Sequence, residues 1–232
     1  NGSMMRCNYC RKKLENLFVD LGHTAIANNY ISKENLNRDE PVYPLRVYVC
    51  DSCFLVQVPP PVEREDIFTP DYAYCSSISV SWLEHCAKYS EMMISRFKLN
   101  RDSLVMEVGS NDGYMLQNFK KKGIPCLGIE PTKSTATIAK EKGLETWIEF
   151  FDENLACKIE AENKFTDLII GNNVIAHVPD IGSFVRGLKR VLKPEGIITL
   201  EFPHLVEIIN SGEFDTIYHE HFSYFSFYSL KN

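Results

Sequence analysis

From residue 103 onward the sequence alternates short apolar runs with stretches of helical pattern, and this alternation limits the possible folds more than any other feature. Strands are predicted at 104–108, 126–130, 167–171 and 197–201, with a weaker one at 145–148. Helices are predicted at 114–122, between the second strand and about residue 142, and at 181–192, where the turn Lys193-Pro194-Glu195-Gly196 ends the last of them. Strands that alternate with helices form a parallel sheet covered on both faces. The sequence therefore predicts an α/β fold with a Rossmann-like parallel sheet.

Eight cysteines are the second informative feature, and four of them form two Cys-x-x-Cys pairs, Cys7 with Cys10 and Cys50 with Cys53. The chain starts Asn1-Gly2-Ser3-Met4-Met5, without a charged-then-apolar secretion signal, so we expect a cytoplasmic setting, in which disulfides are rare. Two such pairs supply the tetrahedral four-sulfur shell of a structural zinc ion, which leaves no open position for a substrate. A pair of redox motifs and a set of unligated thiols are the alternatives.

These features divide the chain into three parts. Residues 4–60 form the zinc-binding module, with strand-like runs at 46–50 and 54–58. Three prolines at 59–61 end it, because proline lacks the donor that a strand needs. Residues 61–100 form a linker and a helix at 81–97, and the apolar residues of this helix recur at helical spacing. We expect this part of the chain to contribute to a substrate site. Residues 101–232 form the Rossmann-like domain.

A glycine-rich turn joins the first strand of this domain to the following helix. It reads Glu107-Val-Gly109-Ser110-Asn111-Asp112-Gly113, and its glycines allow the backbone to approach a ligand closely. Glu130 ends the next strand, 21 positions after Gly109, where a carboxylate can accept both hydroxyls of a ribose. Asn172 and Asn173 follow the strand at 167–171, at the same edge of the sheet.

Each of these positions alone has a plainer interpretation, as a tight turn or a solvated acid. In this order, and together with the segment at 188–197, they resemble the S-adenosylmethionine (SAM) site of class I methyltransferases. The spacing Gly-x-x-x-Gly differs from the Gly-x-Gly-x-x-Gly of enzymes that bind NAD. The combination therefore favours SAM over NAD.

Within the segment at 213–226, the run Tyr218-His219-Glu220-His221 places two histidines, a carboxylate and a tyrosine just after the last predicted strand. The carboxyl edge of a parallel sheet is where such folds place their chemistry. Any one of these residues could instead belong to the surface or the core. A metal site of the form His-Glu-His is another interpretation, but adjacent residues on a strand point to opposite sides and form a poor chelate.

With these residues in view, the chain resembles the sugar C-methyltransferases that act on nucleotide-linked keto-deoxysugars and carry an N-terminal zinc-binding module. The resemblance rests on the two cysteine pairs, on Asp71-Tyr72-Ala-Tyr74-Cys-Ser-Ser77, on the glycine-rich turn, on Asn172-Asn173-Val-Ile-Ala-His177, and on Tyr218-His-Glu-His221. It implies a class I methyltransferase sheet, SAM and structural zinc as cofactors, and a role in deoxysugar biosynthesis.

The resemblance also implies the site residues. His221 matches the proposed general base, and four residues match those that line the reacting sugar: Tyr72, His177, Tyr218 and Glu220. The cofactor contacts are expected from Glu107, Gly109, Ser110, Asn111, Gly113, Glu130, Asn172 and Asn173, and the zinc ligands are Cys7, Cys10, Cys50 and Cys53. A carbon atom next to a carbonyl becomes nucleophilic when a base removes its proton and donors stabilise the enolate oxygen, and histidine and tyrosine suit these tasks. The zinc would then be structural and remote from the reacting atoms.

Composition limits the partners. The formal net charge of −6 gives no basic excess, so we expect no nucleic-acid partner. The sequence has no run of eighteen apolar residues, so neither a transmembrane helix nor a membrane partner is expected. The expected partner is a nucleotide sugar, and a monomer is compatible with the sequence, which leaves the oligomeric state open.

Two other functions stay open at this point. An O-methyltransferase acting on a nucleotide-activated or surface-polysaccharide sugar needs a base but no enolate stabilisation. A zinc-ribbon interaction module on a degenerate methyltransferase fold would not bind SAM, although the intact glycines and both acids argue against degeneracy. The family that the chain resembles continues beyond the position of Asn232 into a C-terminal domain, so we expect a sheet of about five strands, incomplete at the C-terminus, and a substrate site without that domain.

Overall fold

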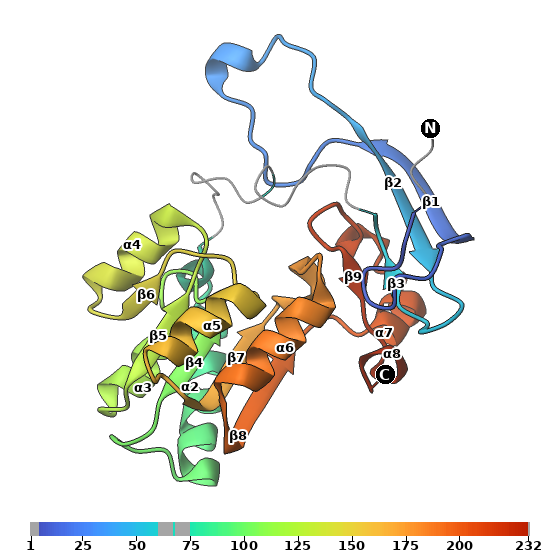
Figure 1. Cartoon of the computed structure of the whole chain (residues 1–232). Coiled ribbons are helices and arrows are strands. Elements are labelled where there is room, and N and C mark those ends of the chain that lie inside the picture. Colours follow the sequence, from blue (N-terminus) through green and yellow to red (C-terminus); the bar gives the residue numbers. More distant parts are fainter. Residues whose placement is uncertain (1–4, 60–66, 68–74, 232) are drawn as a thin grey trace. The chain divides into compact units, whose positions relative to one another are not determined.

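The fold comes from a computed structural model, which describes residues 5–59, 67 and 75–231. The chain forms two compact units (Figure 1). The first comprises Asn1–Phe68, Ile175–Ile181 and Phe202–Asn232, and the second comprises Thr69–Val174 and Gly182–Glu201. Each unit is therefore assembled from separate stretches of sequence. The division of the sequence into 4–60, 61–100 and 101–232 stays a prediction.

The second unit is built on a five-stranded sheet in which all neighbouring strands are parallel. In chain order the strands are β4 (Val105–Val108), β5 (Cys126–Ile129), β6 (Glu145–Trp147), β7 (Thr166–Asn172) and β8 (Leu192–Glu201). Across the sheet they follow the order β6-β5-β4-β7-β8. The direction of winding reverses between β4 and β7, and open α/β sheets bind ligands beside the carboxyl ends of the strands at such a switch point. The predicted Rossmann-like parallel sheet is confirmed.

Helices cover both faces of this sheet. One core cluster joins β4 and β7 to α2 (Val80–Phe97), α3 (Leu116–Lys121) and α4 (Lys133–Glu141). The opposite face carries α5 (Glu153–Ala161) and α6 (Ile181–Val191), which lie in front of the strands in Figure 1. These two helices bury large apolar side chains, including Leu155, Ile159, Phe184 and Leu188. Each side chain of this size contributes about 1.5–3 kcal/mol when it leaves water.

The strand β8 differs from its prediction, because it begins at Leu192 and not at Ile197. Its pairing with β7 jumps from Thr166–Leu192 to Leu168–Ile197. The predicted turn at 193–196 is therefore a bulge inside the strand. Pro194 has no N–H to offer the ladder, which accounts for the interruption at this place.

The first unit is built on a four-stranded antiparallel sheet in the order β1-β2-β3-β9. Its strands are β1 (Asn16–Thr24), β2 (Tyr43–Val49), β3 (Val56–Gln57) and β9 (Ser223–Tyr224). The first three belong to the predicted zinc module, whereas β9 follows the histidine-containing segment near the end of the chain. The module and this segment therefore share one sheet.

Short helices complete the first unit. They are η1 (Lys33–Asn35), η3 (Ile175–His177), α7 (Leu205–Ser211), η4 (Phe214–Thr216) and α8 (Phe227–Lys231). The core of the unit joins β2, β3, α7 and β9 through Leu45, Val47, Val56, Val58, Leu205, Ile208 and Tyr224. Residues far apart in the sequence thus depend on one core.

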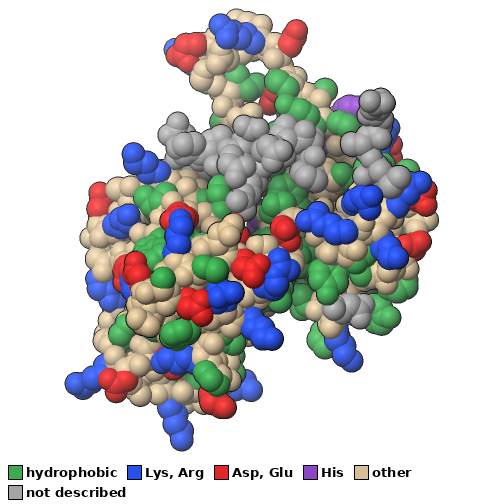
Figure 2. Space-filling model, in the orientation of Figure 1, with side chains coloured by type: hydrophobic (Ala, Val, Ile, Leu, Met, Phe, Trp, Pro, Cys, Tyr) green, Lys and Arg blue, Asp and Glu red, His purple; other side chains and the backbone are tan. Residues whose placement is uncertain are grey.

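The surface of the second unit mixes charges of both signs (Figure 2). On the outer faces of α5 and α6, Arg186 pairs with Glu153 at 2.7 Å and Arg190 pairs with Glu160 at 2.6 Å. Exposed ion pairs of this kind contribute at most about 1 kcal/mol each. Within the described part of the chain, no helix combines the length and the apolar character of a membrane span.

Candidate active site

The glycine-rich turn after β4 is a tight loop that the end of β5 holds in place. The backbone N–H groups of Gly109 and Ser110 both donate to the carbonyl of Ile129, at 2.8 and 3.1 Å. Gly109, Asn111 and Gly113 have φ angles of 68°, 48° and 79°. This left-handed region favours glycine and tolerates asparagine. The residue types at these three positions are therefore what the backbone of the loop requires.

Both glycines of this loop also leave no room for a side chain. A Cβ atom at Gly109 would lie 2.5 Å from Cγ2 of Val174, and one at Gly113 would lie 2.3 Å from Cδ1 of Leu144. The first contact joins the loop after β4 to the end of β7, and the second joins it to the segment before β6. The loop is therefore packed closely on both sides of the switch point.

Gly113→Ala is expected to lower the affinity for SAM by at least about tenfold, or ~1.4 kcal/mol, because the new Cβ atom forces either the loop or the buried Leu144 side chain to shift. Gly123→Ala is the matched control, since Gly123 has a φ of 74° and open space around it. In the control variant only the left-handed backbone conformation is unfavourable, which should lower the free energy of unfolding by about 1 kcal/mol. Calorimetric titration with SAM and thermal unfolding would measure both effects, and equal losses of affinity in the two variants would contradict this account.

Three buried carboxylates surround the loop: Glu107 at 0%, Asp112 at 1% and Glu130 at 5% exposure. Lys142, which follows α4, donates to the backbone carbonyl of Asp112 at 2.7 Å and to its Oδ2 at 3.1 Å. Neither carboxylate oxygen of Glu107 has a partner with hydrogen-bond geometry among the described residues. Burial raises the pKa of Glu107 well above its ordinary value, and Glu130 and Asp112 raise it further, although the Tyr114 hydroxyl favours the ionised form.

Glu130 fixes the loop through both of its oxygens. Its Oε2 accepts from the backbone N–H of Asn111 at 2.9 Å, and its Oε1 accepts from the N–H of Thr132 at 2.8 Å. Burial raises the pKa of Glu130, against these two donors. Each carboxylate oxygen can accept a second bond, so this geometry still permits contacts to the two hydroxyls of a ribose.

The residues around the loop fit SAM, which carries a sulfonium and an ammonium group. Unsatisfied buried carboxylate oxygens are stabilised by a positive ligand. Glu107 would face this charge, Glu130 would bind the ribose, and the glycines let the backbone approach. These carboxylates and glycines therefore suit SAM, the cofactor that the sequence predicts.

Two further segments border the loop within the second unit. Asn172 ends β7 as a buried residue, and the exposed Asn173 has a φ of 54° and donates its N–H to the carbonyl of Glu201 at 2.7 Å. On another side, the backbone N–H of Ser76 in η2 (Ser76–Ile78) donates to Oδ1 of Asn111 at 2.9 Å. All eight predicted cofactor residues thus lie in the second unit, around the ends of β4, β5 and β7.

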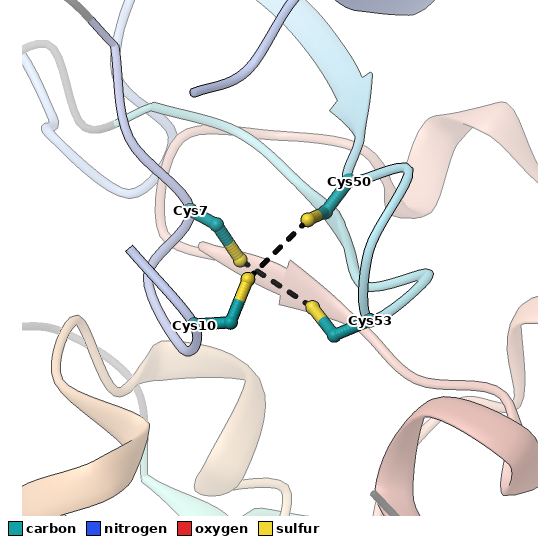
Figure 3. A group of neighbouring side chains, drawn as sticks. All are labelled: Cys7, Cys10, Cys50 and Cys53. Carbon is teal, nitrogen blue, oxygen red and sulfur yellow. Dashed lines mark hydrogen bonds between the residues drawn. The ribbon is translucent and has the colours of Figure 1, made fainter. Parts of the chain in front are cut away.

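The four paired cysteines converge in the first unit, as Figure 3 shows. Their sulfur atoms all lie within 4.8 Å of one another, with Cys7 to Cys53 and Cys10 to Cys50 both at 3.5 Å. A tetrahedral zinc ion with Zn–S bonds of ~2.3 Å sets neighbouring sulfurs roughly 3.8 Å apart. The short contacts join different Cys-x-x-Cys pairs, whereas a redox motif would join its own two cysteines. The arrangement therefore fits zinc.

Both cysteine knuckles have the same backbone form. The residue after each pair, Arg11 or Phe54, has a φ near 60° and donates its N–H to the carbonyl of the first cysteine of that pair. Gln57 of β3 supports the cluster, because its Nε2 donates to Sγ of Cys7 at 3.2 Å. Burial alone would raise the pKa of Cys7, but hydrogen bonds from Gln57 and two backbone N–H groups lower it to about 7. The thiolate, which is the form that binds zinc, is therefore favoured at Cys7, whereas burial raises the pKa of Cys10 and Cys53.

The histidine-containing segment fixes the tautomer of His221. Its Nδ1 lies 2.8 Å from the carbonyl of Thr216, which can only accept, so Nδ1 carries the proton. Its Nε2 therefore has a lone pair and accepts from the Tyr218 hydroxyl at 3.0 Å. Burial lowers the pKa of His221, with the Thr216 carbonyl acting in the opposite direction. His221 is thus a neutral imidazole with its basic nitrogen beside a phenol.

His177 and Glu220 lie next to this histidine. The rings of His177 and His221 have centroids 4.7 Å apart, and Nδ1 of His177 bonds the backbone carbonyl of Glu220 at 2.9 Å. Burial and the proximity of His221 lower the pKa of His177 to about 3. The Glu220 carboxylate accepts from Nδ2 of Asn28 at 2.9 Å. Four predicted catalytic residues are thus together in the first unit.

His219 has a different environment. It is fully buried, its Nε2 bonds the carbonyl of Pro44 at 3.2 Å, and its ring packs edge-on against Tyr43. Among the described residues, the one group of three or more potential metal ligands is the four-cysteine cluster. The His-Glu-His interpretation therefore receives no support. The fifth predicted catalytic residue, Tyr72, lies outside the described residues.

Several residues that hold these sites could not be predicted from the sequence. Asn28 contacts Glu220, Gln57 contacts Cys7, and Lys142 contacts Asp112. Each bond joins residues at least 30 positions apart in the sequence. The separation leaves no local motif by which to find them.

The five-stranded parallel sheet in the order β6-β5-β4-β7-β8, with a glycine-rich loop after β4, is the fold of class I SAM-dependent methyltransferases, and this fold defines the class of the protein. Residues 84–232 match the family described as "Methyltransferase domain", and residues 7–68 match the family described as "Putative zinc binding domain". The chain belongs to the methyltransferase-domain family.

Two relatives of the chain are also methyltransferases. The chain is 34% identical over 212 residues to the C-methyltransferase NovU of Streptomyces niveus, an alignment that covers 91% of the chain and 50% of NovU. It is 34% identical over 104 residues to the ubiquinone biosynthesis O-methyltransferase of Actinobacillus pleuropneumoniae serotype 7, which covers 40% of the chain and 43% of that enzyme. The chain thus spans half or less of the length of these two relatives.

One solved structure is informative about the fold alone. It is the complex between the Haloferax volcanii Trm112 methyltransferase activator and a methyltransferase, which the chain matches with a TM-score of 0.50 and 15% identity. The match covers 65% of this chain and 67% of the other.

Proposed function

We propose that the protein transfers the methyl group of SAM to a carbon atom of a nucleotide-linked 4-keto-deoxysugar, through an enolate that His221 generates. The observation that carries the proposal is the arrangement of His221, with Nδ1 protonated against Thr216 and Nε2 available as a base beside the Tyr218 hydroxyl. The similarity to NovU, which is named a C-methyltransferase, supports the choice of carbon as the acceptor.

The second unit would hold the cofactor. Glu130 would bind the ribose hydroxyls, Glu107 would face the positive end, and the loop from Gly109 to Gly113 would pack against the methionine part. When bound, SAM supplies an electrophilic methyl group. The contribution of the chain is to orient that group and to exclude water from it.

The first unit would carry the proton chemistry. Nε2 of His221 takes the proton from the carbon next to the keto group, and the electrons of that C–H bond move to the keto oxygen. The Tyr218 hydroxyl, released from Nε2, donates to the developing enolate oxygen. His177 stays neutral because its pKa is lowered to about 3, so it adds no second positive charge beside the protonated His221. The enolate carbon is then the nucleophile.

Binding of SAM is expected to release a proton from Glu107. Burial, Glu130 and Asp112 raise the pKa of this carboxyl in the free protein, and a positive ligand lowers it. Affinity should therefore rise with pH, by at most about tenfold per pH unit, because the ligand prefers the ionised form. Calorimetry in buffers of different ionisation enthalpy would count the protons. Glu107→Gln should remove this dependence, and its persistence in that variant would contradict the assignment.

Deuterium exchange tests the enolate directly. In heavy water with a 4-keto-sugar nucleotide, the protein should introduce deuterium at the carbon next to the keto group, and the product should carry the methyl group on that carbon. Methyl transfer to oxygen, without exchange by active protein, would contradict the proposal. That result would favour the O-methyltransferase alternative.

A further inference from the structure

The zinc cluster and the histidine-containing segment are linked through one short strand. Cys50 and Cys53 lie between β2 and β3, and β3 pairs with β9. In this pairing Gln57 is opposite Ser223 and Val56 is opposite Tyr224. The N–H of Val58 continues the link by donating to the carbonyl of Phe222, the residue after His221, at 3.0 Å.

Gln57 connects this strand to the cysteines through its side chain. The side chain is fully buried, and its Nε2 donates to Sγ of Cys7 and to the carbonyl of Leu55, at 3.2 and 3.3 Å. Its Oε1 accepts from the backbone N–H of Asn8 at 2.7 Å. One amide thus binds the first knuckle by both ends, while its own backbone belongs to the strand that pairs with β9. A buried amide with this many partners holds its strand in one position relative to the cluster.

The link continues from β9 to the two histidines. The N–H of Phe222 donates to the carbonyl of Ala176 at 2.7 Å, next to His177, and the N–H of His221 donates to the carbonyl of Tyr218 at 3.0 Å. A displacement of β3 would therefore move Phe222. His221, which precedes Phe222, and His177, which follows Ala176, would move with it. A misplacement of about 1 Å can reduce a reaction rate by ~100-fold.

We propose that Gln57 is a positioning residue that ties the zinc centre to the segment carrying His221, so that the metal sets the geometry of the reacting histidine and not only the stability of the module. This inference rests on the proposed role of His221. It qualifies the expectation of a remote zinc ion: the metal takes no part in the reaction, yet a chain of hydrogen bonds joins its ligands to the reacting segment.

Gln57→Met is the first test, because methionine keeps the length of the side chain and removes both of its hydrogen bonds to the first knuckle. The variant should retain zinc and bind SAM as wild type does, but its kcat should fall by about 10- to 100-fold, as for other residues that orient metal ligands. The 15N resonances of the His221 imidazole should also change, because its bonds to Thr216 and Tyr218 are displaced.

Arg46→Gln is the matched control, since Arg46 pairs with Asp20 on the exposed side of the same sheet, at 2.8 Å. The control should leave zinc content, resonances and kcat unchanged.

Two results would overturn the inference: His221 resonances and kcat that stay at wild-type values in Gln57→Met, or a loss of zinc that accounts for the whole effect. If that variant does not fold, Gln57→Glu gives the second test. Its carboxylate keeps the bond from Asn8 and lacks the donor to Cys7, so the His221 resonances should again shift, and unchanged resonances would overturn the inference. Absence of methyl transfer by the wild-type protein would count against the proposed function, whereas the resonances would still decide whether Gln57 is coupled to His221.

Discussion

Replacing His221 with alanine is expected to reduce methyl transfer by ~100- to 10,000-fold, the range that a general base supplies. Affinity for SAM should stay within about twofold of wild type, because the predicted cofactor residues lie in the other unit, around the ends of β4, β5 and β7. The reason for the large effect is specific. Nδ1 of His221 is fixed as a donor by Thr216, so Nε2 is the one atom of this side chain that can accept the substrate proton.

The control for this variant is His23→Ala, which removes an exposed histidine from β1 of the same unit. It should leave both turnover and SAM affinity unchanged. Calorimetry and a methyl-transfer assay would separate the two quantities. A large loss of SAM affinity in His221→Ala, or turnover equal to wild type, would refute the assigned role.

The pH profile gives a further check on the same residue. Burial lowers the pKa of His221 below its ordinary value of 6.5, so the neutral, basic form persists to more acidic pH. Activity should therefore be lost only as the pH falls through this lowered pKa, at a pH below 6.5. An acid limb above that value would mean that another group limits the reaction.

Cys50→Ser is expected to lose most of the bound zinc and to lower the thermal midpoint by on the order of 10 °C. This estimate takes ~4 kcal/mol for the damaged site and about 2–4 °C per kcal/mol for a chain of this size. The sulfur of Cys50 lies 3.5 Å from that of Cys10, so its replacement opens the tetrahedral shell. Since β3 begins shortly after this cysteine and pairs with β9, the damage should extend to the segment that carries His221.

Cys157→Ser is the matched control, because Cys157 is an exposed free cysteine of α5 in the other unit. It should change neither zinc content nor the thermal midpoint. Metal analysis and calorimetric unfolding would measure both. Retention of full zinc content and stability by Cys50→Ser would count against the four-cysteine assignment.

Much of the fold could be predicted because its signals are local. The apolar runs that became β4, β5 and β7 are buried strands, apart from the partly exposed Cys126 and Asp167, and the helix α2 shows the spacing of a helix that packs on a core. The strand β1 escaped prediction because it is mostly exposed, and only Val19 and Leu21 of it pack against the core. The helix α5 also escaped, although Asp152 caps it by accepting from the N–H of Leu155 at 2.8 Å.

In the candidate site, too, the contiguous motifs could be predicted and the long-range contacts could not. The loop from Gly109 to Gly113 and the two cysteine pairs are contiguous motifs, so their residue types identify them without a structure. The contacts of Asn28 with Glu220 and of Gln57 with Cys7 span 192 and 50 positions, and only the fold brings them together. The sheet that joins the zinc module to β9 could not be predicted for the same reason, because a two-residue strand near the end of the chain carries no pattern of its own.

The proposed activity is methylation of a carbon atom of a nucleotide-linked keto-sugar. The most direct test incubates it with SAM labelled with 13C in the methyl group and a panel of nucleotide sugars, half of them 4-keto compounds and half their reduced counterparts. Mass spectrometry and carbon NMR of the products then show which sugar gains a methyl group and on which atom. We expect methylation of keto-sugars alone, with the labelled methyl group bonded to carbon. Methylation of the reduced sugars, or a methyl group bonded to oxygen, would contradict it.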